Sequence, residues 1–123
     1  MKVVLSIKPE FAFKIFNGTK RFEFRKAIFK NPLVKQVIVY ASSPVQRVIG
    51  EFEIEEILKC DKKLLWELTK QESGITEDFF FQYFKEKKDG YAIRIKNTTT
   101  YENSRCLKED YNLLPPQSFA YYI

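Results

Sequence analysis

The sequence contains no histidine among its 123 residues. This absence excludes Ser/His/Asp and Cys/His nucleophile arrangements, and it excludes zinc sites built on imidazole ligands. Catalysis by this chain would therefore depend on Lys, Glu, Asp, Tyr or a hydroxyl side chain. The range of enzyme mechanisms open to the protein is correspondingly narrow.

Cysteines and long apolar runs are also scarce. The two cysteines, Cys60 and Cys106, are isolated from each other, which indicates reduced thiols in a cytoplasmic protein rather than a disulfide or a metal site. No apolar run approaches the ~20 residues that span a bilayer, and the charge of Lys8 interrupts the apolar start that a signal peptide would need. We therefore expect a cytoplasmic protein with no membrane contact, no metal and no cofactor.

Aromatic residues and basic charge are abundant. The 12 Phe and 7 Tyr predict a compact core or aromatic-lined pockets, and the length predicts one domain over residues 1–123. Residues 1–50 carry ten Lys and Arg against two acids, a net charge of +8, whereas residues 51–123 carry eleven against fourteen, a net charge of −3. This asymmetry is typical of a protein with one face on phosphate, although a merely soluble basic surface gives the same counts.

Hydrophobic periodicity predicts about six strands and about three helices. Apolar or alternating segments indicate strands within 3–7, 20–25, 37–41, 45–58, 91–96 and 113–123, with Gly50 at a bulge or bend. Helices are expected from Pro9, after Asp61 and after Thr76, because proline suits the first helical turn and Asp and Thr are N-cap residues. The polar segment 98–104 is expected to form a turn. These elements predict an α+β domain whose sheet curls into a small barrel.

The segment from Gly18 to Arg25 holds the most suggestive charged residues. Its alternation places two phenylalanines on one strand face and charged residues on the other. Lys20 and Glu23 would lie on opposite faces of a regular strand, so they converge only if Lys20 belongs to the turn after Gly18. The segment therefore predicts either a binding pocket or an exposed, salt-bridged strand face worth ~0–1 kcal/mol.

The same segment resembles a known family. Gly18, Lys20, Glu23 and Arg25 reproduce the G-x-K-x-x-E-x-R signature of ASCH domains, which are members of the PUA-like superfamily. The resemblance extends over nearly the whole chain, through blocks at 5–9, 40–45, 50–52, 90–93 and 115–119. These blocks are similar to a subgroup described as predicted transcriptional regulators. The resemblance implies a PUA-like barrel with a cleft formed by the signature, the Ser-Ser-Pro turn and the C-terminal block.

The resemblance also implies a class of ligand and two possible reactions. Relatives in the superfamily bind RNA or modified nucleobases. One ASCH branch is an amidohydrolase that acts on N4-acetylcytidine with a Lys, a Thr and a Glu; Lys20 matches the lysine and Glu72 is a candidate for the glutamate, but Glu23 occupies the threonine position. Another ASCH member is a ribonuclease. If the chain is an enzyme, Lys20, Glu23 and Glu72 are the catalytic candidates.

Several further residues are candidates for ligand binding. Lys8 and Arg47 flank the expected cleft and could contact phosphate, whereas a solvated surface is the alternative for each. Tyr40, Tyr91 and Phe119 could stack on bases, although core packing explains any one aromatic residue equally well or better. The full set of ligand-binding candidates is Lys8, Gly18, Lys20, Glu23, Arg25, Tyr40, Ser42, Ser43, Arg47, Ser118 and Phe119.

Three functions remain open from the sequence. The first is a nucleic-acid-binding domain with a possible regulatory role, taking RNA or a modified nucleotide, with DNA as a further possible partner. The second is a hydrolase of the amidohydrolase or ribonuclease type, acting without a metal. The third is a protein-interaction or inhibitor module.

Overall fold

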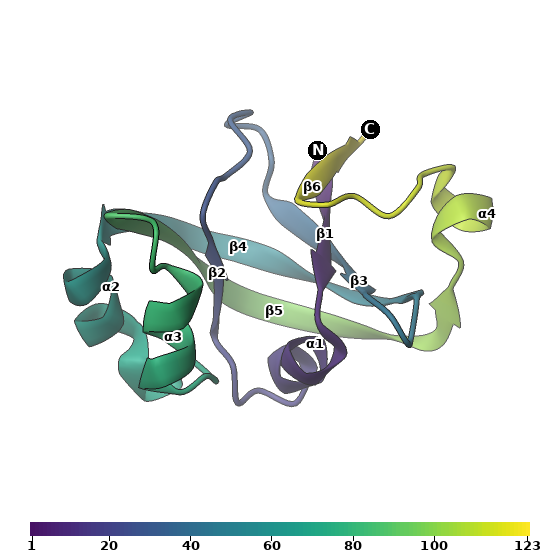
Figure 1. Ribbon diagram of the computed structural model, residues 1–123. Helices are drawn as coiled ribbons and strands as arrows, with labels where there is room; N and C mark the ends of the chain where they lie inside the picture. Colours follow the sequence, from purple (N-terminus) through teal and green to yellow (C-terminus); the bar gives the residue numbers. More distant parts are fainter.

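The protein, described over residues 1–123 by a computed structural model, is built on one six-stranded sheet with the order β2-β5-β4-β3-β1-β6 (Figure 1). Its strands are β1 (Lys2–Ile7), β2 (Phe22–Arg25), β3 (Gln36–Ala41), β4 (Arg47–Asp61), β5 (Asp89–Arg105) and β6 (Phe119–Tyr122). β1 and β3 are parallel, and every other neighbouring pair is antiparallel. The six strands and the mixed α+β class are as the sequence predicts.

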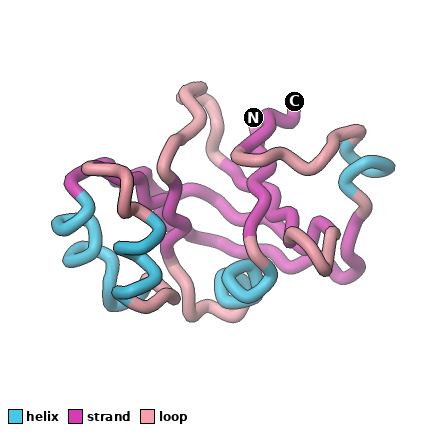
Figure 2. The backbone as a smooth tube through the Cα atoms, viewed as in Figure 1, coloured by secondary structure: helices cyan, strands magenta, loops and turns pink.

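Four α-helices accompany the sheet, one more than the sequence predicts (Figure 2). They are α1 (Pro9–Phe16), α2 (Lys62–Thr69), α3 (Glu77–Tyr83) and α4 (Leu107–Tyr111), and a short 3₁₀ turn, η1 (Lys70–Glu72), follows α2. The predicted N-caps are confirmed: the side chain of Asp61 accepts from the backbone N–H of Lys63, and that of Thr76 accepts from Phe79. None of these helices has the length and apolar character needed to cross a membrane.

The sheet curls strongly but does not close into the expected barrel. β2 and β6 are its two edges, and no ladder joins β2 to β1 or to β6. The strands β5, β4 and β3 separate β2 from β1 in the sheet, but the curl brings β2 back beside β1. The guanidinium of Arg25 on β2 accordingly lies 3.4 Å from the carbonyl of Ser6 on β1. An open seam between β2 and β1 is the result.

Strand β5 is longer than the sequence predicts. The polar segment 98–104, expected as a turn, continues the strand and pairs with the first half of β4 through Gly50 and Glu51. Asn97 has a left-handed backbone (φ 49°) and lies at a register shift between β4 and β5. The irregularity is local, and the pairing of β5 with β4 continues beyond it. The prediction of a turn was wrong because the polar side chains of this segment belong to a strand that is exposed to solvent. Gly50 itself lies at a register shift, as predicted.

Three apolar clusters hold the sheet. The largest packs α1 and the segment 28–34 on one sheet face, and a second joins α4 to the other face through residues such as Ile38, Tyr40 and Tyr111. The third lies beneath α2 and α3, where Trp66 is buried among Phe22, Phe24, Phe80 and Phe84. This aromatic cluster fixes β2 and α3 against each other, and both elements border the seam.

Candidate functional site

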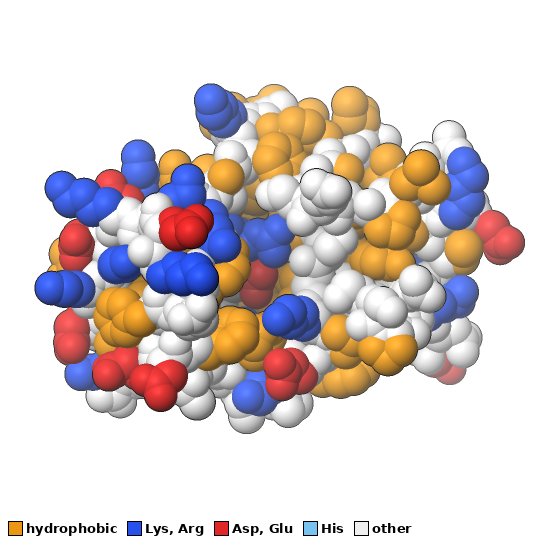
Figure 3. Space-filling view, viewed as in Figure 1, with side chains coloured by type: hydrophobic (Ala, Val, Ile, Leu, Met, Phe, Trp, Pro, Cys, Tyr) orange, Lys and Arg blue, Asp and Glu red, His pale blue; other side chains and the backbone are white.

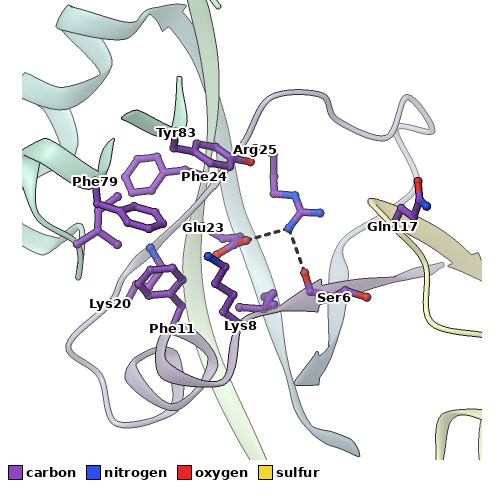
Figure 4. A pocket seen from close by; sticks show the side chains of 12 residues that line it. Ser6, Lys8, Phe11, Lys20, Glu23, Phe24, Arg25, Phe79, Tyr83 and Gln117 are labelled. Atoms are coloured by element: carbon purple, nitrogen blue, oxygen red, sulfur yellow. Dashed lines mark hydrogen bonds and ion pairs between the residues drawn. The ribbon is translucent and has the colours of Figure 1, made fainter. Parts of the chain in front are cut away.

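The open seam between β1 and β2 is a pocket of about 270 Å³ (Figure 4). α1 and α3 complete its walls, and in the space-filling view Lys and Arg side chains gather around a central hollow on this face (Figure 3). Its lining residues are Ser6, Ile7, Lys8, Phe11, Lys20, Glu23, Phe24, Arg25, Ile75, Phe79, Tyr83 and Gln117. Four of the predicted ligand-binding side chains, Lys8, Lys20, Glu23 and Arg25, therefore line one cavity.

Lys20 and Glu23 converge because Lys20 precedes the regular strand. The backbone turns at Gly18, whose φ is +87°, and the N–H of Lys20 donates to the carbonyl of Lys14 at the end of α1. β2 begins only at Phe22. The alternation of side chains along the strand thus applies to Glu23 and Arg25 but not to Lys20. Lys20 lies in the turn after Gly18, as the sequence analysis required for Lys20 and Glu23 to share a pocket.

The side chain of Lys20 is the most unusual feature of the pocket. The residue is 1% exposed, its Nζ donates to the carbonyl of Ser73 at 2.9 Å, and it lies 4.7 Å from the ring centroid of Phe24 and 5.4 Å from that of Phe11. Burial lowers the pKa of Lys20 from 10.5 to about 8, since desolvation outweighs the attraction of Glu23. A buried amine with a pKa near 8 can donate or accept a proton close to neutral pH.

Glu23 and Arg25 form a nearly buried ion pair at the edge strand. Arg25 Nη1 lies 3.0 Å from Glu23 Oε2, and Arg25 Nη2 donates to the carbonyl of Ser118 at 2.7 Å. Together with the contact to Ser6, these bonds make Arg25 a bridge between β2, β1 and the segment before β6. Arg25 thereby orients the Glu23 carboxylate and has few donors left for a ligand.

One oxygen of Glu23 remains open to the pocket. Oε2 accepts from Arg25, whereas Oε1 makes no hydrogen bond. Every buried side-chain nitrogen and oxygen in the protein has a partner, so Oε1 must be accessible from the cavity. The pocket therefore offers an ammonium donor and a carboxylate acceptor that are both held in place.

The loop 72–75 is a part of the site that sequence reasoning missed. Three consecutive carbonyls are bound there: Glu72 accepts from the backbone N–H of Arg21, Ser73 from Lys20 Nζ and Gly74 from Lys14 Nζ. The backbone of Gly74 is left-handed, with φ +69°. The Ser-Gly pair at 73–74 was the available signal, since such pairs mark turns.

Aromatic rings form the apolar wall of the pocket. Phe79 and Tyr83 lie one turn apart on α3, and the ring of Phe11 from α1 meets that of Phe79 edge-on at 5.1 Å. Phe79 and Tyr83 are not among the ligand-binding residues predicted from the sequence. Phe80 occupies the buried face of α3, so Phe79 and Tyr83 face the pocket. Burial raises the pKa of the Tyr83 hydroxyl.

The other candidate side chains do not line the pocket. Tyr40 is buried in the cluster beneath α4, Arg47 binds Ser104, and Phe119 packs against Phe29 and Tyr121. Tyr91 lies beneath the ammonium of Lys59. The remaining candidates outside the lining are Gly18, Ser42, Ser43, Glu72 and Ser118, of which Gly18 shapes the turn while Glu72 and Ser118 contribute backbone carbonyls.

Known proteins match this chain in sequence and in fold. Residues 5–113 match the ASCH domain. An ASCH domain-containing ribonuclease from Zymomonas mobilis is 34% identical over 123 residues, covering 98% of this chain and 83% of that protein. The crystal structure of ASCH from Zymomonas mobilis has a TM-score of 0.90 at 31% identity, over 99% of this chain and 87% of that one.

A more distant structure shares the fold alone. The N-terminal domain of McrB from Staphylothermus marinus has a TM-score of 0.54 at 16% identity, over 92% of this chain and 80% of that one. The family match and the Zymomonas relative both span the seam, the signature and the loop 72–75. The chain belongs to the ASCH domain family.

Proposed function

We propose that the protein binds RNA by taking one nucleobase, standard or modified, into the pocket between β1 and β2. The observation that carries the proposal is the buried Lys20 ammonium beside the open Oε1 of Glu23 on the floor of an aromatic-walled cavity. Burying a lysine costs free energy, and no buried ion pair with Lys20 offsets that cost. Such a residue is a reasonable candidate for a role in binding.

The pocket matches the chemistry of a base better than that of a phosphate. A base edge presents neighbouring donors and acceptors, which Glu23 and Lys20 can satisfy, while the rings of Phe79 and Phe11 supply stacking surfaces worth ~1–3 kcal/mol per base. A volume of about 270 Å³ is below the ~300–1,000 Å³ of pockets for drug-sized ligands, so it suits a single ring system and excludes a helix. The name of the Zymomonas relative, a ribonuclease, supports RNA as the polymer.

The test is binding of fluorescent oligoribonucleotides to the variants Lys20→Met and Phe79→Ala. Loss of a charge-assisted hydrogen bond should weaken binding by about 10- to 100-fold for Lys20→Met, and loss of the ring should weaken it by a similar factor for Phe79→Ala. Lys62→Met is the matched control, because Lys62 Nζ also donates to a backbone carbonyl, that of Phe84, but lies outside the pocket. Unchanged affinity in both pocket variants, with the fold retained by circular dichroism, rejects the proposal.

A second candidate function is ribonuclease activity at the same pocket. It is favoured by the pKa of Lys20, about 8, which leaves roughly one-tenth of the amine neutral at pH 7, and by the relative's name. A neutral Lys20 would take the proton of the 2′-hydroxyl as that oxygen attacks the adjacent phosphorus, and the departing 5′-oxygen would take a proton from solvent water. Cleavage of RNA that rises with pH up to about 8 and disappears in Lys20→Met supports this function; cleavage that survives the substitution excludes Lys20 as the base.

Product analysis separates the remaining alternatives. Incubation with N4-acetylcytidine tests for the amidohydrolase reaction, for which Glu23 occupies the position of the threonine in that branch. Binding without any cleavage favours a regulatory role. Capture of a protein and no nucleotide favours an interaction module.

A further inference from the structure

Two unpaired lysines cover the aromatic wall of the pocket. Lys8 Nζ lies 5.5 Å from the ring centroid of Phe79, and Lys26 Nζ lies 4.7 Å from that of Tyr83. Both lysines are exposed, and neither takes part in any ion pair of the protein. Their charge is therefore available to a ligand at the mouth of the pocket.

The two lysines come from opposite sides of the seam. Lys8 follows β1 directly and precedes α1, whereas Lys26 follows β2 directly. The rings beneath them, Phe79 and Tyr83, are four residues apart on α3, which corresponds to ~6 Å along the helix axis. Lys8 and Lys26 thus lie over two rings that are about one helical turn apart, and the cavity between β1 and β2 opens beside these rings.

We propose that Lys8 and Lys26 bind the two phosphates that flank the inserted nucleotide, so that the pocket takes a base from within an RNA strand rather than a free nucleoside or a chain end. This inference rests on the proposed function. Lys8 and Lys26 lie over different rings, one on each side of the seam, so a strand that crosses the mouth of the pocket can present one phosphate to each. The base between those two phosphates would leave the stack to enter the pocket.

The arrangement of the other cations supports this assignment. Arg25, a ligand-binding candidate by sequence, uses its donors for Glu23 and for the carbonyls of Ser6 and Ser118. Lys20 is 1% exposed and its Nζ donates to the carbonyl of Ser73, so Lys20 is placed to contact the inserted nucleotide and not the phosphates on either side of it. Cation–π contact with α3 restricts the rotamers of Lys8 and Lys26, which reduces the entropy lost when they bind phosphate.

The test compares nucleosides with oligoribonucleotides of about seven nucleotides, within the usual site sizes for single strands. The probes are oligomers of uridine, cytidine and adenosine, together with the three free nucleosides. The variant is the double substitution Lys8→Gln and Lys26→Gln, and the control is Lys59→Gln, because Lys59 Nζ lies 5.7 Å from the ring of Tyr91 but outside the pocket. Affinities are measured between about 50 and 200 mM salt.

Loss of two phosphate contacts should reduce the salt slope for oligomers by about 1.4, since each contact to a single strand contributes about 0.7. The wild-type protein should then lose about sevenfold more affinity than the double variant across that salt range. Nucleoside affinity should fall much less than oligomer affinity in the double variant, and Lys59→Gln should resemble the wild type with every probe.

Two results overturn the inference and leave the proposed function standing. One is an unchanged oligomer affinity and salt slope in the double variant while nucleosides and oligomers both bind. The other is a parallel loss of nucleoside and oligomer affinity, which assigns the lysines to the pocket itself. If neither kind of probe binds the wild-type protein, the proposed function fails together with the inference.

Discussion

The α-carbon of Gly74 packs directly against the side chain of Lys20. A Cβ atom at residue 74 would lie 2.5 Å from Cβ and 2.7 Å from Cγ of Lys20, closer than carbon atoms approach. The position of the buried ammonium therefore depends on a residue 54 positions away that carries no functional group. Gly74 also places the carbonyl of Ser73, the hydrogen-bond acceptor of Lys20.

Substitution of Gly74 by Ala should destabilise the protein by about 2–5 kcal/mol. About 1–2 kcal/mol is expected from the left-handed backbone, and about 1–3 kcal/mol from the overpacking against Lys20. Gly18→Ala is the matched control, because Gly18 also has positive φ but a Cβ there would meet nothing within 4 Å. Chemical unfolding measures both variants, and equal losses would contradict the packing argument.

The buried Lys20 should make the protein more stable as pH rises above 8. The folded-state pKa, about 8, is below the ordinary value of 10.5, so the unfolded chain binds more protons between these values. The free energy of unfolding should therefore increase from pH 8 to 10.5, by roughly 3 kcal/mol if fully realised. The unfolding free energy of wild type and of Lys20→Met is measured at pH 8 and at pH 10.5. The gain attributable to Lys20 is the amount by which the increase in wild type exceeds the increase in Lys20→Met. Identical pH profiles would show that the Lys20 pKa is not lowered.

Neutralising Glu23 should lower the pKa of Lys20 further. Glu23 is the charge that opposes the desolvation of the ammonium, and Glu23→Gln removes it while keeping a similar shape. NMR titration of the lysine Cε signals measures the shift, with Glu67→Gln as control, because Glu67 pairs only with the exposed Lys70. A Lys20 pKa that stays the same or rises would mean that the charge of Glu23 does not stabilise the Lys20 ammonium.

Removal of Arg25 should cost about 3 kcal/mol of stability. Arg25→Ala leaves the carboxylate of Glu23, whose side chain is 8% exposed, without its partner, and breaking a buried pair from one side typically costs this much. It also removes the bridge from β2 to Ser6 and Ser118. Lys70→Ala, which breaks a surface pair with Glu67, should leave the unfolding midpoint nearly unchanged. Similar midpoints for both variants would indicate that the seam is held by other contacts.

Tyr101→Phe should destabilise the protein by about 1–2 kcal/mol at neutral pH without affecting ligand binding. The Tyr101 hydroxyl donates to Glu51 at 2.7 Å on the sheet face that packs against α4. Burial raises the pKa of Glu51, but the hydrogen bonds from Tyr101 and Lys2 outweigh it and leave that pKa below 4.5.

The stability that Glu51 provides is therefore present above pH 4.5 and is lost as pH falls through the lower folded-state pKa. In unfolding experiments, the difference in the free energy of unfolding between wild type and Tyr101→Phe should therefore decrease over the same acid range. Tyr91→Phe, which removes a hydroxyl with no hydrogen bond among the side chains, is the control. Weakened RNA binding in Tyr101→Phe would show that the two sheet faces are coupled.

Local patterns predicted most of the elements because capping and alternation act over a few residues. Asp61 and Thr76 begin helices as expected, and the C-terminal segment pairs with β1 as a closing strand. The prediction failed where long-range pairing replaced local preference. The polar segment 98–104 forms a strand only because the first half of β4 supplies partners for its backbone.

The site divides in the same way. The signature predicted that Lys20, Glu23 and Arg25 would be important, and the placement of Lys20 in the turn after Gly18 was identified as the condition for a pocket. Arg25 was a ligand-binding candidate, whereas in the structure it spans the seam, a role that depends on Ser6 and Ser118. Tyr40 was a stacking candidate but packs beneath α4.

The sequence by itself determined the ASCH family, the α+β class and the charged signature, since these follow from residue order and short-range periodicity. The tertiary structure alone decided that the sheet stays open, that the seam between β1 and β2 becomes the pocket, and that the loop 72–75 and α3 form its wall. The physical reason is that burial arises between distant segments. Lys20 has a lowered pKa because Ser73, Gly74 and Phe11 enclose it, and no local pattern brings those residues together.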